Sequence, residues 1–177
     1  MKISPLDEYG LRCMVQLART GPDGALTIPE LAEREGLSEA YVAKVMGLLK
    51  GAGLVHAARG RAGGYRLAAP PSEIAVAGVM SALGGPTWES VGCDRFNGAH
   101  EVCVHSAGCS IRSLWAALDA VIDQLLGNVT LADLLGGERL TGDRLRAMQE
   151  RGLKPAGVTC APRWPLRTVQ STETQEV

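Results

Sequence analysis

Apolar residues recur at helical spacing in several short segments of this chain of 177 residues. The first segment follows Ser4-Pro5, where a serine can cap a helix and a proline fits its first position, and it ends at the turn 21–24. Thr27-Ile28-Pro29-Glu30 has the capping-box pattern, a threonine followed three residues later by a glutamate. It predicts a second, shorter helix over about 28–35.

A third helix is predicted directly after the second, because Gly36-Leu37 supplies a turn and Ser38 can cap a helix that extends to about Lys50. Two helices joined in this way are typical of a helix-turn-helix, although any small helical hairpin can show the pattern. Two short strands follow, over 54–58 and 64–67, with a turn rich in glycine and arginine between them. A hairpin at this place makes a wing, so we predict a mainly α fold with a small β-wing, a winged helix-turn-helix.

The second half of the chain is predicted to hold one long helix. A fourth helix over 72–83 is broken at Gly84-Gly85-Pro86, and residues 86–108 form a loop whose length indicates a function. The long helix extends from Cys109 to Leu126 and carries a wide apolar stripe of Ile111, Leu114, Trp115, Leu118, Val121, Ile122 and Leu125. A partner subunit is the expected cover for this stripe, and packing on the chain's own winged helix is the alternative.

The C-terminal part shows a weaker pattern. Residues 130–135 predict a short capped turn, a short helix is possible near 141–151, and the prolines and polar residues from Lys154 onward indicate a mobile tail. The predicted organisation is therefore a DNA-binding domain, a metal-binding loop, a dimerisation helix with a helical turn, and a C-terminal extension. Their ranges are 1–83, 84–108, 109–135 and 136–177.

Charge is distributed unevenly along the chain, although the net charge is only −1. The stretch from Ala40 to Ser72 contains no acidic residue and holds Lys44, Lys50, Arg59, Arg61 and Arg66. Such a local basic patch favours contact with the phosphates of double-stranded DNA. No secretory signal or long apolar stretch is present, so we expect a cytoplasmic protein without a membrane span.

Three of the five cysteines lie in or next to the long loop. Cys93, Cys103 and Cys109 have the spacing C-x9-C-x5-C, which brings thiolates to one metal centre more readily than it serves a core. An odd number of cysteines does not suit a closed disulfide framework, so reduced thiols are expected. Cys13 lies on the apolar side of the first helix and is expected in the core. Cys160 is expected to be a free thiol in the tail.

The third helix and the wing supply the candidate DNA contacts. Ser38 can contact phosphate through its hydroxyl and the helix N-terminus. The early helical positions that should face the major groove are Glu39, Ala40, Tyr41 and Lys44. Arg59 or Arg61 at the wing tip should enter the minor groove, with a solvated hairpin turn as the alternative. The spacing also predicts core positions at Leu31, Val42, Val45, Leu48 and Leu49.

Taken together, these segments resemble the Rrf2 family of winged-helix regulators over about residues 1–135. The resemblance rests on Tyr9-Gly10-Leu11-Arg12, Gly53-Leu54-Val55, the wing 59–67, Ile74-Ala75-Val76, and the cysteine loop with its following helix. It implies a homodimer in which the long helices cross. It also implies an iron–sulfur cluster, 2Fe–2S or 4Fe–4S, held by the three loop cysteines and a fourth ligand that varies among members.

The fourth ligand is not fixed by the resemblance, because the first cysteine interval is longer here than is common and Arg112 replaces a histidine found in some members. Glu8 is the first candidate, since a nitric-oxide-sensing relative places a carboxylate from the partner subunit there. The alternative for Glu8 is a solvated acid that the helix dipole favours. His105 is the next candidate, and Asp7, His100 and a small thiol are also possible.

Three functions follow from these patterns. The first is an iron–sulfur-dependent transcription repressor that senses cluster status, redox state or nitric oxide. The second keeps the DNA binding but replaces the cluster by a structural zinc or a Cys103–Cys109 disulfide switch. The third is an enzyme such as a thiol oxidoreductase, which we do not expect, because the chain has no CxxC motif, nucleotide-binding loop or catalytic arrangement of Cys, His and Asp.

Overall fold

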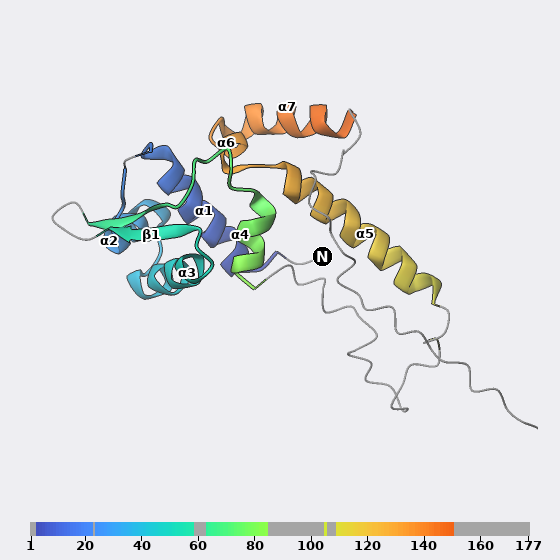
Figure 1. Cartoon of the computed structure of the whole chain (residues 1–177), viewed down its shortest axis with the longest axis horizontal. Coiled ribbons are helices and arrows are strands. Elements are labelled where there is room, and N and C mark those ends of the chain that lie inside the picture. Colours follow the sequence, from blue (N-terminus) through green and yellow to red (C-terminus); the bar gives the residue numbers. More distant parts are fainter. Residues whose placement is uncertain (1–2, 23, 59–62, 85–104, 106–108, 151–177) are drawn as a thin grey trace, which may run out of the picture.

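A computed structural model describes residues 3–22, 24–58, 63–84, 105 and 109–150 (Figure 1). Helices dominate the described residues, and they are accompanied by one two-stranded antiparallel sheet. The elements in order are α1 (Pro5–Arg19), α2 (Ile28–Glu35), α3 (Glu39–Gly51), β1 (Val55–Ala58), β2 (Gly64–Leu67), α4 (Val76–Ala82), α5 (Ser110–Asn128), α6 (Leu131–Leu134) and α7 (Gly137–Glu150). The predicted fold class, mainly α with a small β-wing, is confirmed.

Each of the first three helices begins at the predicted cap. Ser4 forms a capping box with Asp7, whose carboxylate accepts from the Ser4 hydroxyl at 2.6 Å. Thr27 forms the predicted capping box with Glu30, and Ser38 accepts from the backbone N–H of Tyr41 at 3.3 Å. These contacts satisfy amide groups that the first turn of a helix leaves without partners. The local sequence therefore determines where each of these three helices begins.

The core of the winged helix lies between α1, α2 and α3. Its fully buried side chains include Met14, Leu17, Leu31, Met46, Val42, Val45, Leu49 and Val55. The core positions predicted from helical spacing are confirmed except for Leu48, which is 38% exposed. Leu48 follows Lys44 by four residues, and this spacing places it on the outer face of α3.

The wing stem pairs β1 with β2 in the register Val55↔Leu67 to Ala58↔Gly64. Leu26 adds one bridge to its edge, because Leu26 and Tyr65 exchange both backbone hydrogen bonds, at 2.7 and 3.0 Å. Gly64 makes this approach possible, since a Cβ there would lie 2.7 Å from the backbone of Leu26. The wing is thus fixed to the segment that precedes α2.

Helix α4 begins at Val76, later than the predicted Ser72. Residues before it pair with the segment that follows α5, because Val76 N donates to Val129 O at 2.8 Å and Leu131 N donates to Ile74 O at 3.0 Å. Ala75 and Thr130 form the bridge between these segments. The predicted fourth helix is present. Its predicted first turn is not helical, because Ile74 and Ala75 pair with the segment that follows α5.

Helix α5 attaches to the rest of the protein near its C-terminal end. A second buried cluster of Val76, Met80 and Val129 contacts Leu125 and Leu126 of α5 and Leu145 and Met148 of α7. Helix α5 ends two residues beyond the predicted Leu126, and α7 begins at Gly137 instead of near residue 141, since its first turns pack beside α6. Within the described ranges, no helix has the length and apolar character needed to cross a bilayer.

Candidate DNA interface and metal loop

The outer surface of α3 leaves most of the predicted DNA-contacting side chains open to solvent. Ser38, Glu39, Ala40 and Lys44 are exposed. The Ser38 hydroxyl caps the helix as an acceptor, so its hydrogen is free to be donated to a phosphate. The small Ala40 side chain allows close approach of a groove to the helix backbone. These side chains are therefore accessible to a partner, and their contact with DNA stays a prediction.

Tyr41 differs from its neighbours because it is half-buried. Its ring packs edge-on against that of Tyr9 in α1, with centroids 5.9 Å apart and an interplanar angle of 88°. This is a favoured geometry for two aromatic rings. Tyr41 thus connects α3 to α1, and only part of its surface is open to solvent.

A charged network joins α1 to the end of α2, and sequence reasoning missed most of it. Arg12 forms ion pairs with Glu8 at 3.5 Å and with Glu35 at 2.7 Å, and its guanidinium lies 5.9 Å from the centre of the Tyr9 ring. Glu35 also accepts a hydrogen bond from Gln16. The spacing of Glu8 and Arg12 is visible in the sequence, whereas nothing local indicates Glu35.

The structure describes the stem of the wing but not its tip. Arg59 and Arg61 lie outside the described residues. On the stem, His56 and Arg66 stand opposite each other across the strands, and both are exposed. The strand register therefore makes His56 and Arg66 further candidates for contact with DNA, in addition to Arg59 and Arg61 of the tip.

Only part of the proposed ligand set lies in the described chain. Cys109 is the N-cap residue of α5 and is partly exposed, and His105 is exposed. Cys93 and Cys103 lie outside the described ranges, as do His100 and Cys160. Among the residues that are described, no three His, Cys, Asp or Glu side chains gather at one point. Cys109 nevertheless places the last member of the cysteine pattern at the start of the long helix.

Cys13 is confirmed as a core residue. Its side chain is fully buried in the first core cluster. Burial and, to a smaller extent, the negative charge of Glu35 together raise the pKa of the Cys13 thiol from 9.0 to about 11, while Arg12 opposes the shift. A protonated, buried thiol is a poor metal ligand. Cys13 is therefore not expected to join the loop cysteines in binding a metal.

Glu8 and Cys109 lie on different elements of the chain, Glu8 in the first turn of α1 and Cys109 at the N-cap of α5. Gly10, in the second turn of α1, meets the side chain of Leu83 at the C-cap of α4, whereas the beginning of α5 projects away from the winged helix (Figure 1). The Glu8 side chain is 58% exposed.

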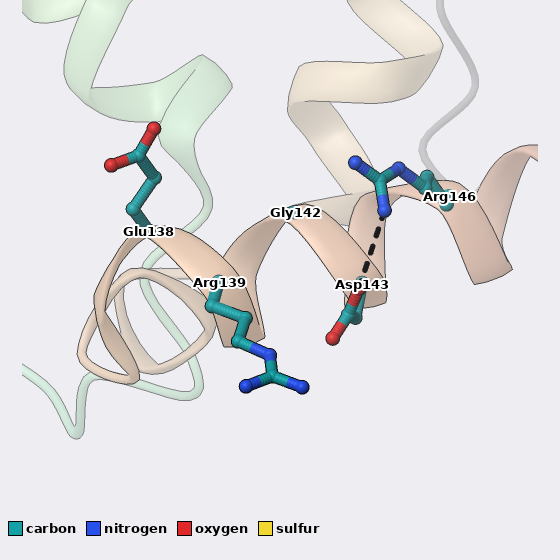
Figure 2. A pocket seen from close by; sticks show the side chains of 5 residues that line it. All are labelled: Glu138, Arg139, Gly142, Asp143 and Arg146. Atoms are coloured by element: carbon teal, nitrogen blue, oxygen red, sulfur yellow. Dashed lines mark hydrogen bonds and ion pairs between the residues drawn. The ribbon is translucent and has the colours of Figure 1, made fainter.

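A shallow hollow on α7 has no chemistry that suggests a site. It is lined by Glu138, Arg139, Gly142, Asp143 and Arg146. Figure 2 shows that the charged side chains point in different directions, and Arg146 pairs with Asp143 at 3.4 Å. Acidic and basic groups that do not converge offer no selective binding of an anion or a cation.

The comparisons of this chain with known proteins agree on one family. Residues 3–137 match the model of the Rrf2 family, described as an iron-dependent transcriptional regulator. An HTH-type transcriptional regulator of Neisseria meningitidis is 32% identical over 149 residues, which cover 84% of this chain and 97% of that relative. The HTH-type transcriptional regulator IscR of Aliivibrio salmonicida is 33% identical over 135 residues, covering 76% of this chain and 77% of IscR.

Solved structures agree with this similarity. IscR of T. potens has a TM-score of 0.59 and 29% identity, and the match covers 87% of this chain and 93% of that one. CymR of B. subtilis, described as the global cysteine regulator, has a TM-score of 0.60 and 29% identity, with 77% and 97% covered. Both matches cover more than three quarters of this chain.

Proposed function

Since the chain belongs to the Rrf2 family of winged-helix transcription regulators, we propose that it is a repressor whose affinity for operator DNA depends on an iron–sulfur cluster. Its relatives are transcription regulators, and the chain is not an enzyme. The open surface of α3, the wing stem and the acid-free stretch 40–72 support docking on double-stranded DNA. The proposal concerns what controls that docking.

The position of Cys109 is the observation that carries this proposal. Cys109 is both the last residue of the C-x9-C-x5-C pattern and the N-cap of α5. Three thiolates suit an iron–sulfur cluster, and the N-terminus of a helix favours the negative charge that such ligands bring. A group bound by Cys93, Cys103 and Cys109 would therefore act on the start of the long helix.

Helix α5 supports a homodimer. Its exposed apolar side chains are Ile111, Leu114, Trp115, Leu118 and Val121, with exposed fractions between 42% and 63%. A stripe of this size is unusual on the surface of a monomer, and a second copy of α5 offers a matching apolar face. Crossing of the two helices would set the positions of the two recognition helices on the DNA.

The dimer also gives the fourth ligand a route to the cluster. Glu8 is exposed on α1, and α5, which begins at Cys109, projects away from the winged helix (Figure 1), so we propose that Glu8 reaches the cluster of the partner subunit. A carboxylate is a harder and more labile iron ligand than a thiolate, which suits a sensor of redox state or nitric oxide. Arg12, which pairs with Glu8 and Glu35, would relate this ligand to the helix-turn-helix.

A second candidate keeps the repressor and replaces the cluster by thiol chemistry or a structural zinc. The similarity to CymR favours it, because CymR matches this chain with a TM-score as high as that of IscR, and CymR of Staphylococcus aureus has been solved in an oxidized form. Cys109 is free and partly exposed, so it could form a disulfide with Cys103.

Anaerobic purification separates the two candidates. We expect a coloured protein that contains iron and acid-labile sulfide, and we expect its operator affinity to change when a chelator removes the iron. A colourless protein with bound zinc, or one whose DNA binding responds only to a thiol oxidant and its reversal by a reductant, would establish the second candidate. Operator binding should be measured by fluorescence anisotropy in each state.

A further inference from the structure

Helix α7 begins where the family match ends, yet it takes part in a buried cluster. The match to the Rrf2 model ends at residue 137, and α7 spans Gly137–Glu150. Its Leu145 and Met148 pack against the buried side chains of Val76, Met80 and Val129. Helix α7 therefore has a packed inner side, although none of its residues is fully buried.

The same cluster attaches the long helix to the winged helix. Leu125 and Leu126, near the end of α5, are the residues of that helix that pack on Val76, Met80 and Val129. The bridge between Ala75 and Thr130 follows directly after α5. From this attachment α5 projects outward, and its first half does not lie against the winged helix (Figure 1).

Polar contacts hold α7 to this attachment through Asp133 of α6. The Asp133 carboxylate accepts from the backbone N–H and the hydroxyl of Thr130, both at 2.9 Å, and forms an ion pair with Arg144 of α7. The Asp133 backbone carbonyl accepts from the hydroxyl of Thr141 at 3.0 Å. Asp133 thus connects the segment after α5 directly to Thr141 and Arg144 in the middle of α7.

We infer that α7 acts as a brace that fixes the angle of α5 against the winged helix and so selects the spacing of operator half-sites. This inference rests on the proposed dimer through α5. A helix of 19 residues is about 28 Å long at 1.5 Å per residue, so a tilt of about 10° at its base moves its far end by about 5 Å. That movement exceeds the rise of one base pair, about 3.4 Å. Leu145 and Met148 are the positioning residues.

The experiment compares Leu145→Asp with Leu140→Asp in the full chain. Both variants place a charge on α7, but Leu140 is 64% exposed whereas Leu145 packs on the cluster. Operator affinity is measured on a series of DNA duplexes whose half-sites are one or two base pairs closer or further apart. We expect the wild type and Leu140→Asp to prefer one spacing, and we expect the preference to fall by about tenfold in Leu145→Asp.

Light scattering on each protein separates this inference from the proposed function. A monomeric wild type would overturn the proposed dimer. A dimeric Leu145→Asp that keeps the wild-type preference would overturn the brace. If Leu145→Asp does not fold, Leu145→Ala and Arg144→Ala decide the question, because they remove only packing or only the ion pair with Asp133. An unchanged preference in both of these variants would also overturn the brace.

Discussion

The Nε atom of Arg12 in α1 lies 2.7 Å from Oε2 of Glu35, the last residue of α2. The Glu35 side chain is 4% exposed, whereas that of Arg12 is 52% exposed. Arg12 therefore compensates a carboxylate that water hardly reaches, immediately before the turn into the recognition helix. Its second pairing, with Glu8, relates the same guanidinium to the proposed cluster ligand.

Replacing Arg12 by Ala should lower the free energy of unfolding by about 1–3 kcal/mol, because the buried Glu35 carboxylate would keep only Gln16 as a partner. Urea unfolding followed by circular dichroism measures this change. The control is Arg146→Ala, since Arg146 and Asp143 are both exposed and their pair should contribute less than about 1 kcal/mol. Equal losses in the two variants would show that Glu35 does not depend on Arg12.

Replacing Leu118 by Asp should give monomers or aggregates, because it places a charge in the apolar stripe of α5 that we assign to the dimer. Binding to an operator with two half-sites should weaken in parallel. Ala120→Asp is the matched control, since Ala120 is exposed and lies on the other side of α5. Sedimentation measures the oligomeric state, and a wild type that binds DNA as a stable monomer would refute the proposed interface.

Cluster content should depend on the loop cysteines alone among the five thiols. Cys93→Ala, Cys103→Ala and Cys109→Ala should each abolish or destabilise the cluster, whereas Cys13→Ala and Cys160→Ala should not. Iron and sulfide analysis with visible absorption provides the measurement. If all three loop variants keep a full complement of cluster, these cysteines are not the cluster ligands.

Glu8→Ala should give a cluster that forms but is lost faster or has an altered reduction potential. The reason is that Glu8 is the proposed labile fourth ligand, contributed by the partner subunit. The comparison is His105→Ala, measured by the same spectra and by the rate of cluster loss in air. If only His105→Ala changes these properties, His105 takes the place of Glu8 as the ligand.

The wing-tip arginines should contact phosphate or a narrow minor groove. If Arg59 or Arg61 contacts a phosphate, its replacement by Ala should reduce the salt slope of operator binding by about one unit. If it reads groove shape, the replacement should cost about 1–3 kcal/mol on the specific site. Anisotropy across a salt series tests this, with Arg146→Ala of α7 as the control. If both wing variants bind the operator as the wild type does at every salt concentration, the tip is only a solvated turn.

Cys13 should resist alkylation by iodoacetamide in the folded protein and react once the chain unfolds, since its thiol is buried and stays protonated. The folded pKa of about 11 lies above the ordinary value of 9.0, so the stability from the neutral thiol is fully present below pH 9. It is lost as the pH rises toward 11. Cys13→Ala should lack this loss, and an identical pH dependence of unfolding in both proteins would contradict it.

The sequence predicted the elements that depend on contacts between near neighbours. Ser4, Thr27 and Ser38 each accept from a backbone N–H three residues further on, so each helix start is encoded within one turn. The burial of Val42, Val45 and Leu49 follows from the helical period, so it could be predicted without knowledge of the tertiary structure. The family resemblance likewise rests on short segments, and the comparison over residues 3–137 confirmed it.

Only the tertiary structure decided which distant groups meet. The sequence alone did not indicate that Val76 would pair with Val129 and shorten α4, or that Arg12 would compensate Glu35. It also did not indicate that α7 would pack on the attachment of α5 through Leu145. Such pairings depend on how whole helices are placed in space, and the periodicity of a single segment carries no information about the surface that its partner will present.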